Sequence, residues 1–252
     1  MASSSPVALV TGGARRIGRA IVEDLAGHGF AVAIHCHDSR TEADAAAAEI
    51  ARAGGKAATV VGDLGEPGSV AKIVGDAVAA LGPLTLLVNN ASIFEKDTVG
   101  QLDRELWQRQ MTVNLAAPVF LAEAFAAQLP AGAEGNIVNL LDQRIWQPTP
   151  LYFSYQLTKS ALHIATLTLA QALAPRIRVN AIAPGPVLPS RHQSEAGFRR
   201  MTEALPLRRA PALADFGRTI RYLVETRSIT GQVIALDGGQ HLGPQPVGSK
   251  DA

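Results

Sequence analysis

The sequence predicts an α/β fold in which a doubly wound, parallel β-sheet carries helices on both faces. Short apolar runs alternate with helix-like segments along the whole 252-residue chain. A glycine-rich turn directly follows the first apolar run, and no low-complexity linker divides the chain. Such strand–helix alternation is typical of a parallel sheet covered by helices. We therefore expect a single domain over residues 1–252.

The first part of the chain predicts four strands and three helices. Strands are expected at 6–11, 31–34, 58–61 and 84–88, and helices at 16 to about 27–29, 41–53 and 69–81. The first run is apolar and stops at glycines, as a buried parallel strand does. Gly27 and Gly29 suit a helix end. The Ala- and Glu-rich segment before Gly54 is typical of a helix that ends at glycine.

The second part predicts three further strands and two long helices. Strands are expected at 136–141, 177–182 and 232–236, and helices at about 103–129 and from the segment of Tyr155 to about 174. Residues 187–198 are expected to form a loop on the substrate side, where loops carry specificity. Residues 240–252 lack periodicity, which predicts a loose tail or a subunit contact.

Composition narrows the classes of function. Hydrophobic residues make up 47% and charged residues 18%, which indicates a folded core. The net charge of +1 gives no support for a nucleic-acid or membrane partner. Cys36 is the only cysteine, which excludes an intrachain disulfide. His35 and His37 flank it, but adjacent strand residues point to opposite faces, so no metal site is expected. The N-terminus lacks signal-peptide features, which predicts a cytoplasmic protein.

The glycine-rich turn is a candidate phosphate-binding loop. Thr11-Gly12-Gly13 ends the first strand, and Gly18 lies at the start of the next helix. Glycines there let the backbone approach a phosphate, and the helix N-terminus supplies N–H groups and partial positive charge. The alternative interpretation is a tight turn that binds no ligand.

Tyr155, Lys159 and Asp142 are the candidate catalytic residues. Tyr155 and Lys159 are four residues apart, which places them on one face of a helix about one turn from each other. A nearby cation favours the tyrosinate and lowers the pKa of the phenol. Tyr155 is therefore a candidate proton donor or acceptor near neutral pH.

Taken together, these motifs resemble the short-chain dehydrogenase/reductase family over nearly the whole chain. The matching features are Thr11-Gly12-x-x-x-Arg16-x-Gly18, Asp63-Leu64, Asn89-Asn90-Ala91-Ser92, Asn114, Tyr155-x-x-x-Lys159 and Pro184-Gly185. Arg16 and Asp142 stand where most of that family has glycine and serine. Both departures are shared with the pteridine reductase branch, which includes the dihydromonapterin reductases. Further features shared with that branch are His35-x-His37-x-Ser39, Asn90-Ala-Ser-x-Phe94 and Tyr152.

The resemblance implies a Rossmann fold that binds NAD(P), acts on a small molecule and assembles as a homotetramer. The implied catalytic residues are Asp142, Tyr155, Lys159 and Asn114. The implied cofactor contacts are Gly12, Arg15, Arg16, Ile17, Gly18, His35, His37, Ser39, Asp63, Leu64, Asn90, Ala91, Ser92, Tyr155, Lys159, Pro184 and Gly185. The implied substrate contacts are Arg16, Ser92, Phe94, Asp142, Tyr152 and Tyr155.

The resemblance also implies a division of roles. Tyr155 would donate the proton, Lys159 would hold the nicotinamide ribose and lower the pKa of Tyr155, and Asp142 would feed protons to Tyr155. Asn114 would hold a helix kink and a water chain that leads to Lys159.

Several of these residues also have a structural interpretation. Phe94, which would stack on the substrate ring, could instead be a loop aromatic packed on the core. Tyr152 could cap a helix turn, and Asp142 could be a helix N-terminal acceptor. Trp146 either lines the pocket or packs at an interface.

Charges near the second strand bear on the choice of cofactor. An acidic residue at the end of that strand selects NAD, and His35 stands at this position. Arg15, Arg16 and Arg40 are cations that can pair with a 2′-phosphate. NADPH is therefore expected. Asp38 would repel the phosphate unless it points outward or pairs with Arg40.

The sequence favours an NADPH-dependent reductase that delivers a hydride to a C=N or C=O bond of a flat, polar heterocycle such as a dihydropterin. Asp142 and Phe94 favour the pterin, since a carboxylate near a ring nitrogen and an aromatic stack suit it. The alternative enzyme is a carbonyl reductase or alcohol dehydrogenase for another small substrate. A third reading is a sensor that binds NADP without turnover, but such proteins usually lack the Tyr155–Lys159 pair.

Overall fold

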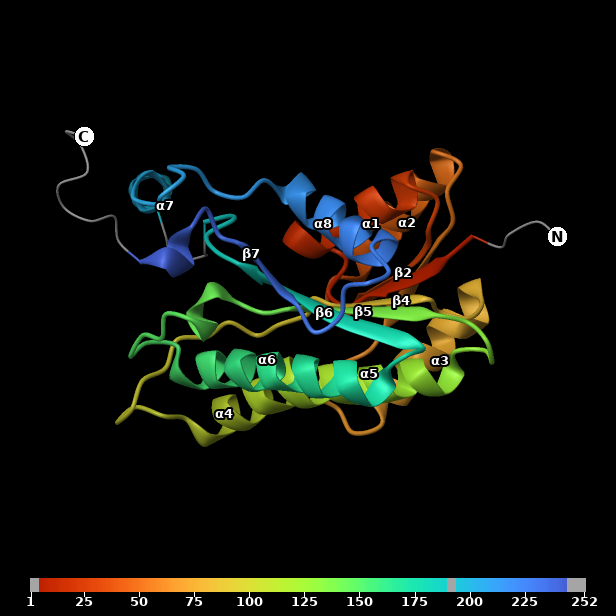
Figure 1. Ribbon diagram of the computed structural model, residues 1–252, viewed down its shortest axis with the longest axis horizontal. Coiled ribbons are helices and arrows are strands. Elements are labelled where there is room, and N and C mark those ends of the chain that lie inside the picture. Colours follow the sequence, from red (N-terminus) through yellow and green to blue (C-terminus); the bar gives the residue numbers. More distant parts are fainter. Residues whose placement is uncertain (1–4, 190–193, 244–252) are drawn as a thin grey trace.

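The computed structural model describes residues 5–189 and 194–243, and these residues form one seven-stranded parallel sheet. The strands are β1 (Val7–Val10), β2 (Ala31–Cys36), β3 (Ala57–Val61), β4 (Leu86–Asn89), β5 (Gly135–Leu140), β6 (Ile177–Pro184) and β7 (Val233–Leu236). Their order is β3-β2-β1-β4-β5-β6-β7, with every pair parallel. The predicted doubly wound parallel sheet is confirmed (Figure 1).

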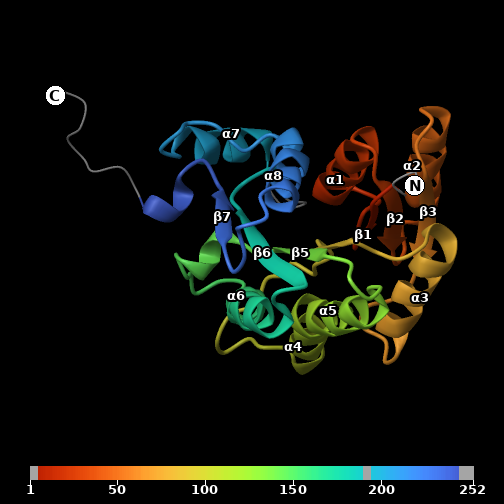
Figure 2. The ribbon, with the colours of Figure 1, turned by 45° about the vertical axis from the view of Figure 1, so that its right-hand side comes forward.

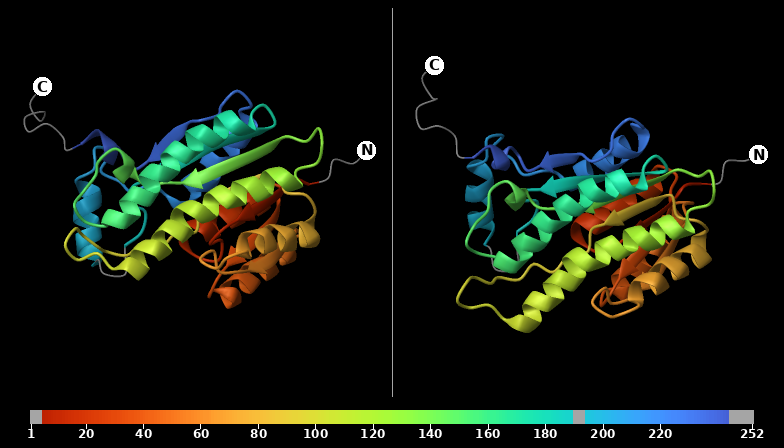
Figure 3. Two further views of the ribbon diagram at one scale, coloured as in Figure 1. Left: turned by 90° about the horizontal axis from the view of Figure 1, so that it is seen from below. Right: turned by 60° about the horizontal axis from the view of Figure 1, so that its bottom comes forward.

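Helices cover both faces of this sheet. They are α1 (Arg16–Gly27), α2 (Arg40–Arg52), α3 (Ser69–Leu81), α4 (Arg104–Met111), α5 (Ala117–Gln128), α6 (Phe153–Leu173), α7 (Glu195–Glu203) and α8 (Leu213–Glu225). Helices α1, α2 and α8 pack on one face, and α3, α5 and α6 on the other (Figures 1 and 2). Helices α5 and α6 run side by side across that second face (Figure 3).

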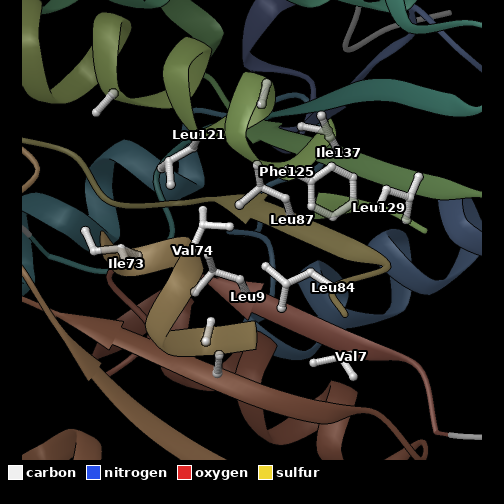
Figure 4. Packing of buried hydrophobic residues seen from close by; sticks show 14 of the residues in the cluster. Val7, Leu9, Ile73, Val74, Leu84, Leu87, Leu121, Phe125, Leu129 and Ile137 are labelled. Carbon is white, nitrogen blue, oxygen red and sulfur yellow. The ribbon is translucent and has the colours of Figure 1, made fainter. Parts of the chain in front are cut away.

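The apolar runs of the sequence supply both layers of the core. In β1, Val7 and Leu9 pack towards α3 and α5, while Ala8 and Val10 pack towards α1. Successive strand residues point to opposite faces, so a strand covered on both sides must be apolar throughout. Figure 4 shows the first of these layers, where Leu9 lies near Val74 of α3.

Two helices, α7 and α8, lie in the part of the chain for which the sequence predicted only a loop and a strand. Helix α8 packs along α1 (Figure 2) and buries Phe216, Ile220 and Leu223. Gly217 permits the close approach, because a Cβ there would lie 2.3 Å from Asp24 Cβ. Residues 190–193 of the predicted loop lie outside the described residues.

The segment that begins the predicted tail is ordered locally. Gln240–Leu242 form a 3₁₀ turn, and residues 244–252 lie outside the described residues. The Nδ1 of His241 lies 2.7 Å from the buried carboxylate of Asp237, and the His241 ring lies 5.1 Å from that of Trp146. Trp146 therefore packs against the C-terminal segment of the same chain. Among the described residues, no helix is long and apolar enough to cross a membrane.

Candidate active site

The glycine loop after β1 is bonded to the segment that follows β4. The hydroxyl oxygen of Thr11 accepts the backbone N–H groups of Asn90 (2.9 Å) and Ala91 (3.0 Å). The Asn90 amide donates to the carbonyl oxygens of Thr11 (2.8 Å) and Gly12 (3.1 Å). The strand order reverses between these two strands, and ligands bind at such a switch point in α/β sheets. Three predicted cofactor residues thus gather there.

This loop leaves no room for side chains at its glycines. A Cβ on Gly18 would lie 2.1 Å from the carbonyl oxygen of Gly12. Gly12 itself has a φ of +61°, which only glycine adopts at little cost. Helix α1 follows at once, and its N-cap residue, Arg15, makes no side-chain capping bond. An uncapped helix N-terminus behind a loop of this kind is suited to a cofactor pyrophosphate.

The His35 ring bonds to the glycine loop and to the segment after β3. The sequence analysis named this residue among the implied cofactor contacts. Its Nδ1 accepts the Gly12 N–H (3.2 Å), and its Nε2 lies 3.0 Å from the Gly62 carbonyl oxygen. Burial lowers the pKa of His35 to about 4. The neutral ring therefore has both nitrogens engaged within the protein.

Arg16 has a left-handed backbone, with a φ of +53°. This conformation costs a residue with a Cβ about 1–2 kcal/mol, which explains why glycine is usual here in the family that the sequence resembles. Its guanidinium donates to the Pro189 carbonyl oxygen at 3.3 Å. Arg16 thus joins the glycine loop to the segment after β6. The neighbouring Ile17 packs on the core.

The other two arginines of the predicted cofactor site pair with carboxylates of α2. Arg15 Nε lies 2.9 Å from Glu42 Oε1, and Arg40 Nε lies 3.5 Å from Asp44 Oδ2. Both pairs are exposed to solvent, where ion pairs contribute little stability. Ser39, the N-cap residue of α2, makes no side-chain capping bond. The side chains of Arg15, Arg40 and Ser39 can therefore turn to bind a phosphate at little cost in free energy.

Beyond β2 and β3 lies a small charged cluster. The Asp63 carboxylate accepts the Arg109 guanidinium (2.9 Å) and the Gly65 N–H (2.8 Å). Burial alone would raise the pKa of Asp63, but these hydrogen bonds lower it below its ordinary value. His37 lies 2.7 Å from Asp38, whose side chain is 85% exposed. Asp38 thus points outward, which is one of the two arrangements in which it would not repel a 2′-phosphate.

Three further predicted cofactor positions, Leu64, Pro184 and Gly185, lie at or just after the ends of β3 and β6. Leu64 is buried in the core. Pro184 ends β6, and Gly185 donates its N–H to the Leu236 carbonyl oxygen at 2.9 Å. A Cβ on Gly185 would lie 2.7 Å from Asp237, so glycine is required for the close approach of the segment after β7.

Tyr155 and Asp142 form a direct hydrogen bond. The Tyr155 hydroxyl donates to Asp142 Oδ2 at 3.0 Å. Asp142 Oδ1 accepts the backbone N–H of Arg144 at 2.9 Å and thereby caps the 3₁₀ turn Gln143–Ile145. Asp142 is therefore both a capping residue and a partner of Tyr155, so the two sequence interpretations coexist.

Lys159 lies one helical turn beyond Tyr155, as its spacing predicted. It is buried, and its Nζ donates to the Leu140 carbonyl oxygen at 2.7 Å. The Nζ also lies 5.7 Å from the centre of the Tyr155 ring. Burial lowers the pKa of Lys159 to about 8, against the negative charge of Asp142, which raises it.

The expected lowering of the Tyr155 pKa is wrong. Burial of the phenol, the charge of Asp142 and the hydrogen bond to Asp142 raise the pKa of Tyr155 well above its ordinary value. The spacing in the sequence indicated that Lys159 lies near Tyr155, but it did not show that the phenol is buried. Burial removes water from the phenol and disfavours the charged phenolate. A phenol that stays protonated suits a proton donor.

Asn114 lies in a π-helical segment, Thr112–Ala116, between α4 and α5. Its side-chain oxygen accepts the Ile93 N–H (2.7 Å) and the Ser92 hydroxyl (3.2 Å), and its Nδ2 donates to the Ile93 carbonyl oxygen (2.9 Å). Single π-helical turns are frequent at functional sites. Asn114 thus fixes the loop after β4 at the predicted irregularity of the helix.

Aromatic rings gather beside Tyr155. Phe94 and Tyr152 are stacked, with ring centres 4.3 Å apart and planes 7° apart. Phe94 also meets Tyr155 edge to face at 4.7 Å. Phe94 therefore lies beside the reactive phenol rather than in the core. Arg144, which the sequence analysis did not single out, lies over both stacked rings and pairs with Asp142.

A second group that sequence reasoning missed holds the N-terminus of α6. Tyr152, the N-cap residue, has a φ of +57° and makes no side-chain capping bond. Instead the buried Asp97 accepts the Ser154 N–H at 3.1 Å and its hydroxyl at 2.5 Å. Gln110 donates to the same hydroxyl at 2.8 Å. This network fixes the residue next to Tyr155.

Comparisons with known proteins show the family of the chain. Residues 6–198 match the family model described as short chain dehydrogenase. The 3-oxoacyl-[acyl-carrier-protein] reductase FabG of Staphylococcus epidermidis is 30% identical over 240 residues, which cover 93% of this chain and 98% of that protein.

Two solved structures are more similar. FolM alternative dihydrofolate reductase 1 from Brucella canis, complexed with NADP, is 56% identical with a TM-score of 0.94 and covers 98% of both chains. The protein of the same description from Brucella suis, also in complex with NADP, is 58% identical with a TM-score of 0.93 and covers 96% of this chain and 97% of its own. By fold, motifs and sequence, the chain belongs to the short chain dehydrogenase family.

Proposed function

We propose that the protein is an NADPH-dependent reductase of pterin-type substrates. The observation that carries the proposal is the hydrogen bond from Tyr155 to Asp142, beside the stacked rings of Phe94 and Tyr152. Identity of 56% and 58% with two proteins described as alternative dihydrofolate reductases, both in complex with NADP, supports it.

The residues present fit the cofactor. The left-handed Gly12, the close packing of Gly18 against Gly12, which requires glycine, and the uncapped start of α1 suit the pyrophosphate. Arg15, Arg40 and Ser39 would hold the 2′-phosphate, since His35 stands where an acidic residue would select NAD and the carboxylates that pair with the two arginines are exposed. When bound, NADPH supplies the hydride for the reduction.

Residues of the chain itself supply the proton that the substrate nitrogen receives. Tyr155 donates its hydroxyl proton to the nitrogen of the C=N bond as the carbon receives the hydride. The buried Lys159 cation stabilises the phenolate that this step leaves. Asp142 accepts a hydrogen bond from the same hydroxyl and would pass a proton taken from solvent back to the phenolate. Phe94 and Ser92 would contact the substrate, together with Arg16.

The test is to mix the protein and NADPH with a dihydropterin, dihydrofolate and a simple 3-oxo ester, and to follow loss of NADPH absorbance. The proposal expects the pterins to have the higher kcat/KM. Preference for the 3-oxo ester would instead support a carbonyl reductase, the function that the similarity to 3-oxoacyl-[acyl-carrier-protein] reductase favours. Tight NADPH binding without any turnover would support a sensor.

NADPH is expected to be preferred over NADH. The 2′-phosphate can pair with Arg15 and Arg40, while His35 offers no carboxylate for a ribose hydroxyl. Charge-assisted bonds of about 1.5–3 kcal/mol correspond to a preference of roughly 10- to 150-fold. The measurement is kcat/KM for both cofactors at two salt concentrations. Equal values would contradict the prediction, and the preference should fall with salt because the pairs are exposed.

Activity is expected to fall as the pH rises through about 8. Lys159 is a cation below its pKa of about 8 and neutral above it. The free enzyme's groups govern kcat/KM, so kcat/KM for NADPH should show this limb. Asp142 raises the Lys159 pKa, so the Asp142→Asn variant should move the limb to lower pH. A profile that stays flat to pH 10 would contradict the role of Lys159.

We propose further that the protein is a homotetramer, as the family resemblance implied. Helix α6 exposes Leu157, Ile164 and Leu167, which are seven and three residues apart and so share one face, and the neighbouring helix α5 exposes Phe120. Such a patch is typical of an interface. Light scattering should give the mass of four chains. Ile164→Glu should give smaller species, whereas the control Val61→Glu, an exposed residue of the edge strand β3, should not.

A further inference from the structure

Arg144 contacts Asp142 and the stacked rings of Phe94 and Tyr152. Its Nη1 lies 3.0 and 3.2 Å from the two oxygens of Asp142. The centre of its guanidinium lies 5.4 Å from the Phe94 ring and 5.2 Å from the Tyr152 ring. The side chain is only 23% exposed. A largely enclosed cation thus contacts both Asp142, the hydrogen-bond partner of the Tyr155 hydroxyl, and the two stacked rings.

This cation has hydrogen-bonding capacity that the protein does not use. The Nε of Arg144 is buried and has no partner among the residues that the structure describes. A guanidinium carries five N–H donors in a fixed plane and no acceptor. The Asp142 pair engages Nη1, and the side chain remains 23% exposed, so a ligand that supplies an acceptor to the rest of the guanidinium gains affinity.

We propose that Arg144 is a specificity residue that donates hydrogen bonds to acceptors on the ring edge of a planar heterocycle. The inference rests on the proposed function and names the feature of the substrate that is read. A 3-oxo ester has a keto oxygen, which Tyr155 must contact, and ester oxygens on a flexible chain that no ring holds in place. A pterin has further carbonyl and ring-nitrogen acceptors fixed in one plane. Only the heterocycle therefore presents acceptors at a fixed place to Arg144 while Tyr155 contacts the reacting nitrogen and the ring lies against Phe94.

A competing role for Arg144 is to position Asp142 and nothing more. The two roles separate in a double-mutant cycle, because an effect that passes only through Asp142 disappears once Asp142 is replaced. The readout is the Kd of a dihydropterin for the complex of protein and NADP⁺, which does not require turnover. The variants are Arg144→Met, Asp142→Asn and the double variant.

Arg144→Met is expected to weaken dihydropterin binding by about 10- to 150-fold, the range for hydrogen bonds to a charged group. The loss should appear mainly in KM, should persist in the Asp142→Asn background, and should spare the 3-oxo ester. Arg144→Lys, which keeps the charge but not the planar fork, should give a smaller loss. The matched control is Arg227→Met, which removes an exposed arginine paired with Glu134 and should change neither substrate.

Equal losses for both substrates, or a loss that vanishes in the Asp142→Asn background, would overturn the inference and leave Arg144 a positioning residue. If the wild type reduces the pterin and Arg144→Met and Arg144→Lys both bind it normally, the role of Arg144 fails while the proposed function stands. If the wild type neither binds nor reduces pterins, both fail. Thermal melting of each variant shows whether it is folded.

Discussion

Replacing Tyr155 by phenylalanine is expected to remove most turnover while cofactor binding stays nearly intact. General acid catalysis by a positioned side chain contributes about 10²–10⁴-fold to a rate. The substitution removes only the hydroxyl that donates to Asp142, and the ring can keep its edge-to-face contact with Phe94. The measurements are kcat on the best substrate and the Kd of NADPH by fluorescence.

The matched control for this substitution is Tyr222→Phe, which removes a hydroxyl from an exposed tyrosine on α8. It should leave kcat unchanged. If Tyr155→Phe turns over at a rate near that of the wild type, Tyr155 is not the acid. If both turnover and NADPH binding are lost, the hydroxyl is needed to hold the cofactor, and the loss of turnover is then not evidence for acid catalysis.

The second large effect is expected at Asp142. Asp142→Ser restores the residue that is common in the family, and it should lower kcat/KM for a pterin by about 100-fold or more if the carboxylate takes part in proton transfer. The loss for a 3-oxo ester should be smaller. Asp142→Asn keeps the shape but cannot carry a proton in the same way, so it should be at least as damaging for the pterin.

The structure provides a control for the capping role of Asp142. Asp103 caps α4 by accepting the Leu106 N–H at 2.8 Å and has no part in the candidate site. Asp103→Ser should change kcat/KM for neither substrate, since serine is also a good N-cap. Equal small losses on both substrates for the Asp142 variants would show that Asp142 only caps its turn. The function would then revert to a general NADPH-dependent carbonyl reductase.

The helix α8 shows what a fuller reading of the sequence could have found. Phe216, Ile220 and Leu223 have the spacing of a buried helical face, and Asp215 lies in the first turn. That signal is local, so it was available from the chain alone. The Arg144 and Asp97 contacts are different. Asp97 bonds to a residue 57 positions away, and no periodic pattern marks either side chain.

The sequence by itself determined the parallel sheet, the place of the glycine loop and the Tyr155–Lys159 pair, because these depend on periodicity and spacing within short segments. The tertiary structure alone decided that His35 braces the loop, that Arg144 covers the aromatic pair, and that the pKa of Tyr155 is raised instead of lowered. The physical reason is that hydrogen-bond partners and the cost of burying a charge are set by groups brought together from distant parts of the chain.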